Sequence, residues 1–153
     1  MIRRTVFATD EASTRYALNG VLVEIDGGKV TMVGTDGRRL AVMAGIGTAS
    51  GGHSTKDFTP VVPTKAMNLV EKALDSETEV KIALDPNRFL MATDRVVISS
   101  RLVEGRFPKY QEVFPSRSEA TVSLSVKDLL QATRQAMIVP SEESRGVDYS
   151  FAE

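Results

Sequence analysis

Apolar and polar residues alternate along much of the first hundred residues, in short runs that turn-forming residues separate. Such runs predict β-strands, because successive side chains of a strand point to opposite faces of its sheet. Asp26-Gly27-Gly28 lies between the first two runs and predicts a hairpin. The expected strands cover residues 17–25, 29–35, 38–44, 78–84, 88–93 and 95–103, and residues 45–59 form a loop rich in Gly, Ser and Thr.

Two segments show a helical period, and residues 1–11 resemble the end of a further helix. One helix is expected to open near Thr64, after a break at Pro63. Its predicted apolar face holds Ala66, Leu69, Val70, Ala73 and Leu74. The other helix covers 126–137, where Ser125 and Asp128 form a capping pattern. Its predicted apolar face holds Val126, Leu130, Thr133 and Met137.

Strands are also expected at 121–126 and 145–153, and the end of the chain partly repeats its beginning. In both places a helix end precedes a polar loop with an arginine (Arg15, Arg145) and then a strand that closes on Glu24 or Glu153. The repeat requires one gap. It suggests that a structural unit begins again near Pro115, and that both ends of this sequence cut through a unit.

Length and composition narrow the classes of protein to consider. A chain of 153 residues with a net charge of −1 can bury a core but is not basic overall. It contains no cysteine, which excludes disulfides and thiolate chemistry. No apolar run is long enough to span a membrane, and the N-terminus lacks the features of a signal peptide. A cytoplasmic protein is therefore expected.

The sequence offers little catalytic chemistry. The glycine loop around Gly45–Gly51 lacks the Gly-Lys-Ser/Thr ending of a P-loop and favours a flexible surface loop. His53 is the single histidine, and a solvated loop histidine is more probable than a metal ligand. Asp36, Asp85 and Asp94 occupy turn positions, where aspartate commonly serves its own backbone. No cofactor and no metal are expected.

Basic residues recur at one spacing on both predicted helices. Lys65 and Lys72, and likewise Lys127 and Arg134, are seven residues apart, which places each pair on one polar face. A solvated face is the ordinary interpretation of such a pair. Contact with nucleic-acid phosphates, without base recognition, is the alternative that the shared spacing favours.

The segment "EGRFPKYQEVFP", residues 104–115, combines prolines, aromatic residues and apolar side chains. It could pack across a sheet edge, where proline prevents further strand pairing, or it could form one wall of an apolar groove.

Four motifs resemble the bacterial sliding clamp, the beta subunit of the replicative DNA polymerase holoenzyme, in order and spacing. They are "RYALNG" (15–20), "TDGRRLAV" (35–42), "VVPTKAM" (61–67) and "RLVEGRFPKYQEVFP" (101–115). The last is the most specific, and the resemblance covers essentially the whole chain. It implies an α+β fold of the DNA-clamp type, with antiparallel sheets outside and helices on the DNA-facing side.

By this resemblance, residues 1–115 correspond to the middle clamp domain without its first strand. Residues 116–153 correspond to the first strand, helix and second strand of the third domain. The family forms a homodimeric ring around duplex DNA and is not catalytic. Its rings bind DNA polymerase subunits, the clamp loader and repair proteins through short linear peptides. The chain is therefore expected to be a fragment of such a clamp.

The resemblance also assigns two sets of residues. The peptide groove would contain Leu18, Thr35, Gly37, Arg38, Arg39, Leu40, Pro108 and Val113. Arg38 stands where many relatives have histidine, and the second wall of the groove comes from the far end of the third domain. The DNA-facing residues would be Lys65, Lys72, Lys127 and Arg134.

Two other classes of function stay open at this point. A small α+β enzyme is disfavoured because no nucleophile, base and orienting group stand out together. An adaptor module without DNA contact would have the same groove but would not need the lysines.

Overall fold

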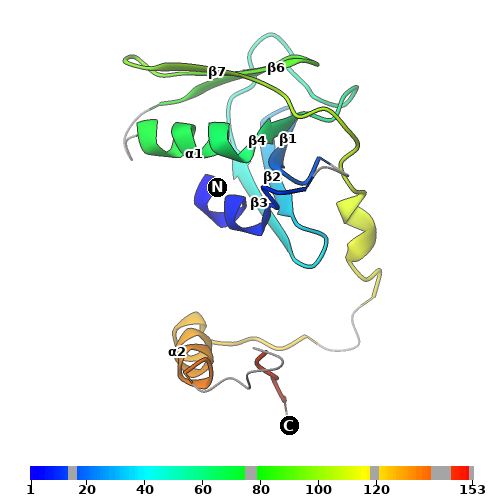
Figure 1. The fold of residues 1–153 in the computed structure, drawn as a ribbon, viewed down its shortest axis with the longest axis vertical. Helices are drawn as coiled ribbons and strands as arrows, with labels where there is room; N and C mark the ends of the chain where they lie inside the picture. The colour runs from blue at the N-terminus through cyan, green and yellow to red at the C-terminus, as the bar shows by residue number, and fades with distance from the viewer. Residues whose placement is uncertain (14–16, 75–78, 118–120, 139–145, 152–153) are drawn as a thin grey trace. The chain divides into compact units, whose positions relative to one another are not determined.

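The computed structural model describes residues 1–13, 17–74, 79–117, 121–138 and 146–151. The chain divides into two compact units, Met1–Val113 and Phe114–Glu153. The first unit contains two sheets and the helix α1 (Thr64–Ala73), and the second contains the helix α2 (Val126–Ala136) (Figure 1).

The larger sheet confirms the first three predicted strands. It contains β1 (Gly20–Asp26), β2 (Lys29–Thr35), β3 (Leu40–Ile46) and β4 (Val61–Pro63), in the order β3-β2-β1-β4. All its neighbouring strands are antiparallel. Asp26 pairs with Lys29 across the β1–β2 turn, so the predicted hairpin forms. Gly27 in this turn has φ of 57°, a backbone conformation that favours glycine.

The smaller sheet confirms the next three predicted strands, with shorter bounds. It contains β5 (Lys81–Leu84), β6 (Arg88–Ala92) and β7 (Val97–Arg101), in antiparallel order β5-β6-β7. Asp85 serves its own turn as predicted, because its Oδ1 accepts a hydrogen bond from the Asn87 N–H at 2.8 Å.

Alternating residues of β1 pack into two different apolar clusters. Val21 and Val23 belong to the main core, which also contains buried residues of α1, β5 and β6. Leu22 points to the opposite face, where it packs in a second cluster with Phe107 and Tyr110. The period of two along the strand thus gives the larger sheet two buried faces.

Helix α1 covers the first of these faces. It contacts β1 and β4 of the larger sheet and β7 of the smaller one (Figure 1). Ala66, Met67 and Val70 are its buried apolar residues. The prediction that Leu69 belongs to this face is wrong, since Leu69 is 59% exposed. At about 100° per residue, Met67 and Val70 lie in the middle of the buried stripe, and Leu69 lies at its edge.

The N-terminal residues form two short 3₁₀ helices, η1 (Ile2–Arg4) and η2 (Val6–Ala8). Ile2 is buried in the main core, and Val6 packs against it. The expected helical character is present, in the tighter 3₁₀ form.

The loop between β3 and β4 places the single histidine against the smaller sheet. The prediction of a solvated His53 is wrong, because its side chain is half-buried and Nε2 accepts a hydrogen bond from the Leu84 N–H at 3.3 Å. Thr55 of the same loop is buried, and its Oγ1 accepts a hydrogen bond from the Ile25 N–H. Backbone groups of β1 and β5 therefore hold this loop on the first unit.

In the second unit, α2 forms as predicted, but the strands expected beside it do not. Ser125 caps α2 by accepting the Asp128 N–H at 3.4 Å. Residues 121–125 and 146–151 contain no strand. A strand requires a hydrogen-bonded neighbouring strand, and neither of these described segments is part of a sheet. No residue of this helix is buried; Val126, Leu130 and Met137 of its predicted apolar face are exposed, and Thr133 is half-buried. Arg15, Arg145 and Glu153 of the sequence repeat lie outside the described residues.

Candidate functional site

The turn between β2 and β3 is fixed by its own side chains. Thr35 Oγ1 donates to the Arg39 carbonyl at 2.7 Å and accepts the Gly37 N–H at 3.1 Å. Gly37 has φ of 85°, so the turn requires a residue without a Cβ at this position. Five of the eight predicted groove residues lie in this turn, which is held in one shape.

Asp36 holds the same turn through three hydrogen bonds. Its Oδ1 accepts the N–H groups of Arg38 and Arg39, each at 2.9 Å, and its Oδ2 pairs with Arg39 Nε at 3.0 Å. The two backbone donors, chiefly that of Arg38, hold the pKa of Asp36 below its usual value. The Asp36 carboxylate therefore forms these hydrogen bonds within its own turn.

Arg39 also contacts the 3₁₀ helix η2. Its guanidinium lies 5.8 Å from the centroid of the Phe7 ring, within the range of a cation–π interaction. Phe7 is itself largely exposed. Phe7 could not be predicted as a neighbour of this turn, because the contact joins positions far apart in the chain.

The apolar wall lies on the second face of the larger sheet. Leu40 is half-buried against the cluster that contains Phe107 and Tyr110. Pro108 is half-buried, and Val113, at the end of the 3₁₀ helix η3 (Tyr110–Val113), is 69% exposed. Leu18 and Thr35 are almost fully buried. Accessible apolar surface therefore comes from Leu40, Pro108 and Val113.

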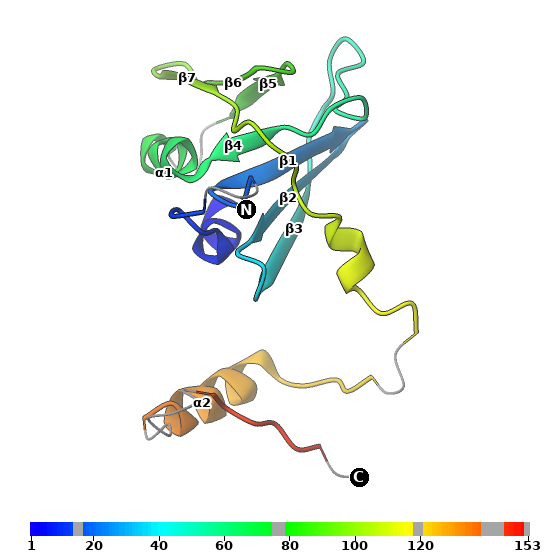
Figure 2. The same cartoon turned by 45° about the vertical axis from the view of Figure 1, so that its right-hand side comes forward.

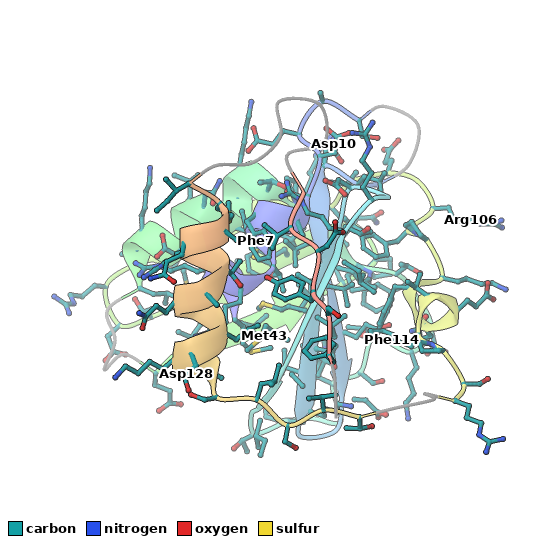
Figure 3. The ribbon with its side chains drawn as sticks, turned by 90° about the horizontal axis from the view of Figure 1, so that it is seen from below. Phe7, Asp10, Met43, Arg106, Phe114 and Asp128 are labelled. Atoms are coloured by element: carbon teal, nitrogen blue, oxygen red, sulfur yellow. The ribbon has the colours of Figure 1, made fainter. Side chains whose placement is uncertain are left out.

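Segment 103–113 crosses this face and presents Pro108 and Val113. Figure 2 shows the chain after β7 running over β1 before it reaches η3. The Val103 N–H donates to the Val61 carbonyl at 2.8 Å, and the Ala17 N–H donates to the Arg106 carbonyl at 3.4 Å. The Arg106 side chain points away from the unit (Figure 3). The segment packs across the sheet face. This position is consistent with both interpretations of its sequence, a segment that packs on the sheet and one wall of an apolar groove.

Tyr110 anchors η3 to the sheet. Its hydroxyl donates to Glu24 Oε2 of β1 at 2.6 Å, and its ring is buried in the second cluster. Burial, followed by the hydrogen bond to Glu24, raises the pKa of Tyr110 to about 12. Neither Tyr110 nor Glu24 was predicted from the sequence. The spacing of Tyr110, three positions after the aromatic Phe107, is a signal that could have indicated the anchor.

The raised pKa of Tyr110 predicts a loss of stability at alkaline pH. The folded value of about 12 exceeds the ordinary value of 10.0, so the stabilisation is complete below pH 10. It is lost as the pH rises from 10 toward 12, by about 2 kcal/mol in the free energy of unfolding. Urea unfolding between pH 8 and pH 12 measures this change. Tyr110→Phe is the control, and a parallel pH dependence in both proteins would contradict the prediction.

The basic residues of α1 and α2 lie on exposed helix faces. Lys65 and Lys72 are exposed on α1, and neither forms an ion pair with a described residue. Glu71 of α1 pairs instead with Arg3. Lys127 and Arg134 are exposed on α2. Each pair is thus accessible to solvent within its own unit.

The described residues contain no cluster of three His, Asp or Glu side chains that could hold a metal ion. None of the helices in this part of the chain is long and apolar enough to cross a membrane.

The fold is that of a DNA-clamp domain. The chain superposes on the crystal structure of the DNA polymerase sliding clamp from Pseudomonas aeruginosa with a TM-score of 0.82 and 31% identity, covering 94% of this chain and 39% of that one. A structure of the clamp from the same organism bound to griselimycin gives a TM-score of 0.81 and 32% identity, covering 95% of this chain and 39% of that one.

Residues 1–109 match the family of the DNA polymerase III beta subunit, central domain, and the chain belongs to that family. The beta sliding clamp of Vibrio cholerae is 34% identical over 154 residues, which cover 100% of this chain and 41% of the relative. The chain spans about 40% of the length of the curated relatives that it matches. The α+β clamp fold expected from the sequence is confirmed.

Proposed function

We propose that this chain acts as part of a bacterial DNA sliding clamp, the processivity factor of the replicative polymerase. In a full-length homodimeric ring it would encircle duplex DNA and hold polymerase subunits, clamp loader and repair proteins through a groove. Residues 1–115 would belong to the middle domain and 116–153 to the third. The role is non-catalytic and cytoplasmic, and it needs no cofactor.

The observation that carries this proposal is the separation of two surfaces on the first unit. Lys65 and Lys72 lie on α1, which covers one face of the larger sheet. Leu40 packs against the cluster on the opposite face, and Pro108 follows Phe107 of that cluster in the chain. A protein that slides on DNA while it holds a partner requires separate surfaces for the two tasks.

The exposed lysines fit sequence-independent binding. Each is a flexible point charge that forms no ion pair with a described residue, and α1 presents the two of them about two turns apart. Contact through phosphates alone costs nearly the same at every position along the duplex, which allows sliding. Lys127 and Arg134 would serve the same purpose on α2.

Charge reversal on α1 tests the DNA contact. Lys65→Glu with Lys72→Glu, in a full-length ring that contains this chain, is expected to shorten retention on circular DNA about tenfold at low salt, because attraction to phosphates becomes repulsion. Retention is measured by gel filtration of loaded, nicked plasmid.

The matched control is Lys29→Glu with Lys81→Glu, two exposed lysines at the starts of strands. This control changes the net charge equally and should retain the wild-type lifetime. Equal retention of both double variants would exclude α1 as the DNA-facing helix and would favour an adaptor without DNA contact.

A further inference from the structure

Strand β5 forms one edge of the smaller sheet, and no described strand pairs with its outer side (Figure 2). The Leu84 N–H donates to His53 Nε2 and therefore points away from β6. Because backbone groups alternate in direction along an antiparallel strand, the N–H and carbonyl of Ile82 point to the same open side. No described residue forms a hydrogen bond with either group there. β5 thus presents unpaired backbone groups to a further strand.

An apolar cleft lies beside this open edge. It has a volume of about 570 Å³ and is bordered by η1, α1 and the smaller sheet. Its walls include residues of the main core, namely Ile2, Met32, Met67, Val70, Ile82 and Phe89. A second cleft of about 270 Å³ also borders Ile82. A strand added to β5 would therefore bury apolar side chains on its inner face.

The fold already contains a strand in the corresponding position of the larger sheet. Helix α1 is followed by the antiparallel strands β5, β6 and β7, as η1 and η2 are followed by β1, β2 and β3. β4 comes directly before α1 and pairs, antiparallel, with the start of β1. The position on β5 that corresponds to that of β4 on β1 holds no strand among the described residues.

Residues 121–125 have the features that this position requires. They come directly before α2, as β4 comes directly before α1. Apolar Val122 and Leu124 alternate with polar Thr121 and Ser123, and all four are exposed. The segment carries no charge and is part of no sheet. It can therefore present an apolar face to the cleft and a polar face to solvent.

The pairing of β4 with β1 predicts a register for this segment on β5. Gly20, the first residue of β1, pairs with Pro63, which is the N-cap of α1. Ser125 is the N-cap of α2. By the same relation, Ser125 is expected to lie opposite Lys81, the first residue of β5.

In this register, side chains of like character face each other. Leu124 lies opposite Ile82, which packs against the main core. Ser123 lies opposite Ala83, which is exposed. A shift of one residue would turn Leu124 to the solvent face, so the apolar pattern favours the same register as the fold does.

We propose that residues 122–125 of a second copy of this chain pair with β5, and that two copies exchange these segments in a symmetric dimer. The pairing ends beside Leu84, because His53 already accepts the N–H of this last residue of β5. The inference does not depend on the proposed function, since it uses only a sheet edge and a segment of unpaired backbone.

The position of the cleft favours a second copy as the source of the segment. The first unit ends at Val113, after the helix η3 that Tyr110 anchors in the second cluster. The cleft belongs to the main core, on the opposite face of the larger sheet. Within one copy, residues 114–120 would have to lead around that sheet, whereas a second copy meets no such constraint.

Cysteine cross-linking of the 153-residue chain tests the pairing, since the chain contains no cysteine of its own. Ser123→Cys with Ala83→Cys places two thiols on directly opposite positions, close enough for a disulfide. Oxidation should convert most of this variant into a covalent dimer on non-reducing gels. The matched control is Ser123→Cys with Ser99→Cys, because Ser99 is exposed on β7, the other edge of the sheet. The control should give no covalent dimer.

Size-exclusion chromatography with light scattering tests the dimer without a cross-link. The wild-type chain should show the mass of two copies and approach that of one on dilution. Val122→Lys with Leu124→Lys should raise the dissociation constant of the dimer at least about tenfold, because two ammonium groups would enter the apolar cleft. Thr121→Lys with Ser123→Lys adds the same charge to the solvent face of the segment and should leave the dimer intact. None of these four side chains is buried, so both variants should remain folded by circular dichroism.

Three results would overturn the inference. The first is a monomeric mass at every concentration, and the second is an equal loss of the dimer in both lysine variants. The third is a disulfide within one chain in Ser123→Cys with Ala83→Cys, which would assign the segment to β5 of its own copy.

Discussion

Leu40→Asp combined with Val113→Asp is expected to abolish peptide binding by a full-length ring that contains this chain. Leu40 and Val113 supply accessible apolar surface on two separate segments of the groove. A carboxylate at either position would have to be desolvated when an apolar anchor docks against it. We expect the affinity for a fluorescent clamp-binding peptide to fall at least about a hundredfold, beyond about 3 kcal/mol. Fluorescence anisotropy measures this affinity.

The control for this prediction lies on the same strand. Ile46 ends β3 and is 98% exposed, so Ile46→Asp introduces a carboxylate on this strand without touching the groove. This variant should bind the peptide normally. Thermal unfolding of the double variant separates a lost groove from a lost fold, since Leu40 also packs against the second cluster. A folded double variant with undiminished titration would disprove the groove assignment.

Gly34→Ala is expected to destabilise the first unit by about 3 kcal/mol in the free energy of unfolding. A Cβ at Gly34 would overlap the backbone carbonyl oxygen of Thr5, which lies between η1 and η2. Backbone cannot rotate away as a flexible side chain can, so β2 or the N-terminal segment must move. Urea unfolding followed by circular dichroism gives the change.

Gly47→Ala provides the comparison. A Cβ at Gly47 would meet only a Val30 methyl group, at 3.7 Å, which is an ordinary contact. Gly47→Ala should lower the free energy of unfolding by no more than about 0.5 kcal/mol, the usual range for a surface substitution. Equal stability of the two variants would show that the N-terminal 3₁₀ helices do not pack on β2 in solution.

The local sequence pattern was sufficient to predict most of the secondary structure of the first unit. Alternation over 29–35 and the Asp26-Gly27-Gly28 turn predicted β2 and its hairpin, because both signals depend on neighbours in the chain. The Ser125 cap of α2 was predictable for the same reason. The eight groove positions came from motif resemblance instead, and they stay a prediction together with the four DNA-facing residues.

Where the sequence interpretation was wrong, the missing information was tertiary. The segment 121–125 alternates as a strand does, yet a strand forms only with a partner, and alternation cannot supply one. Leu69 lies near the apolar stripe of α1, but the packing of the other helix residues decides which edge is buried. His53 is in a glycine-rich loop, and only the folded chain brings it to the Leu84 N–H.

The sequence by itself determined the strands β1, β2, β3, β5, β6 and β7, the two helices and the residues of the turn at 35–40, since local spacing encodes them. Only the tertiary structure decided the different roles of the two arginines in that turn. Arg39 meets Phe7, which is distant in sequence, and pairs with Asp36, while the guanidinium of Arg38 is exposed and has no partner among the residues that the structure describes. Adjacent identical residues carry the same local signal, so only their different spatial neighbours distinguish them.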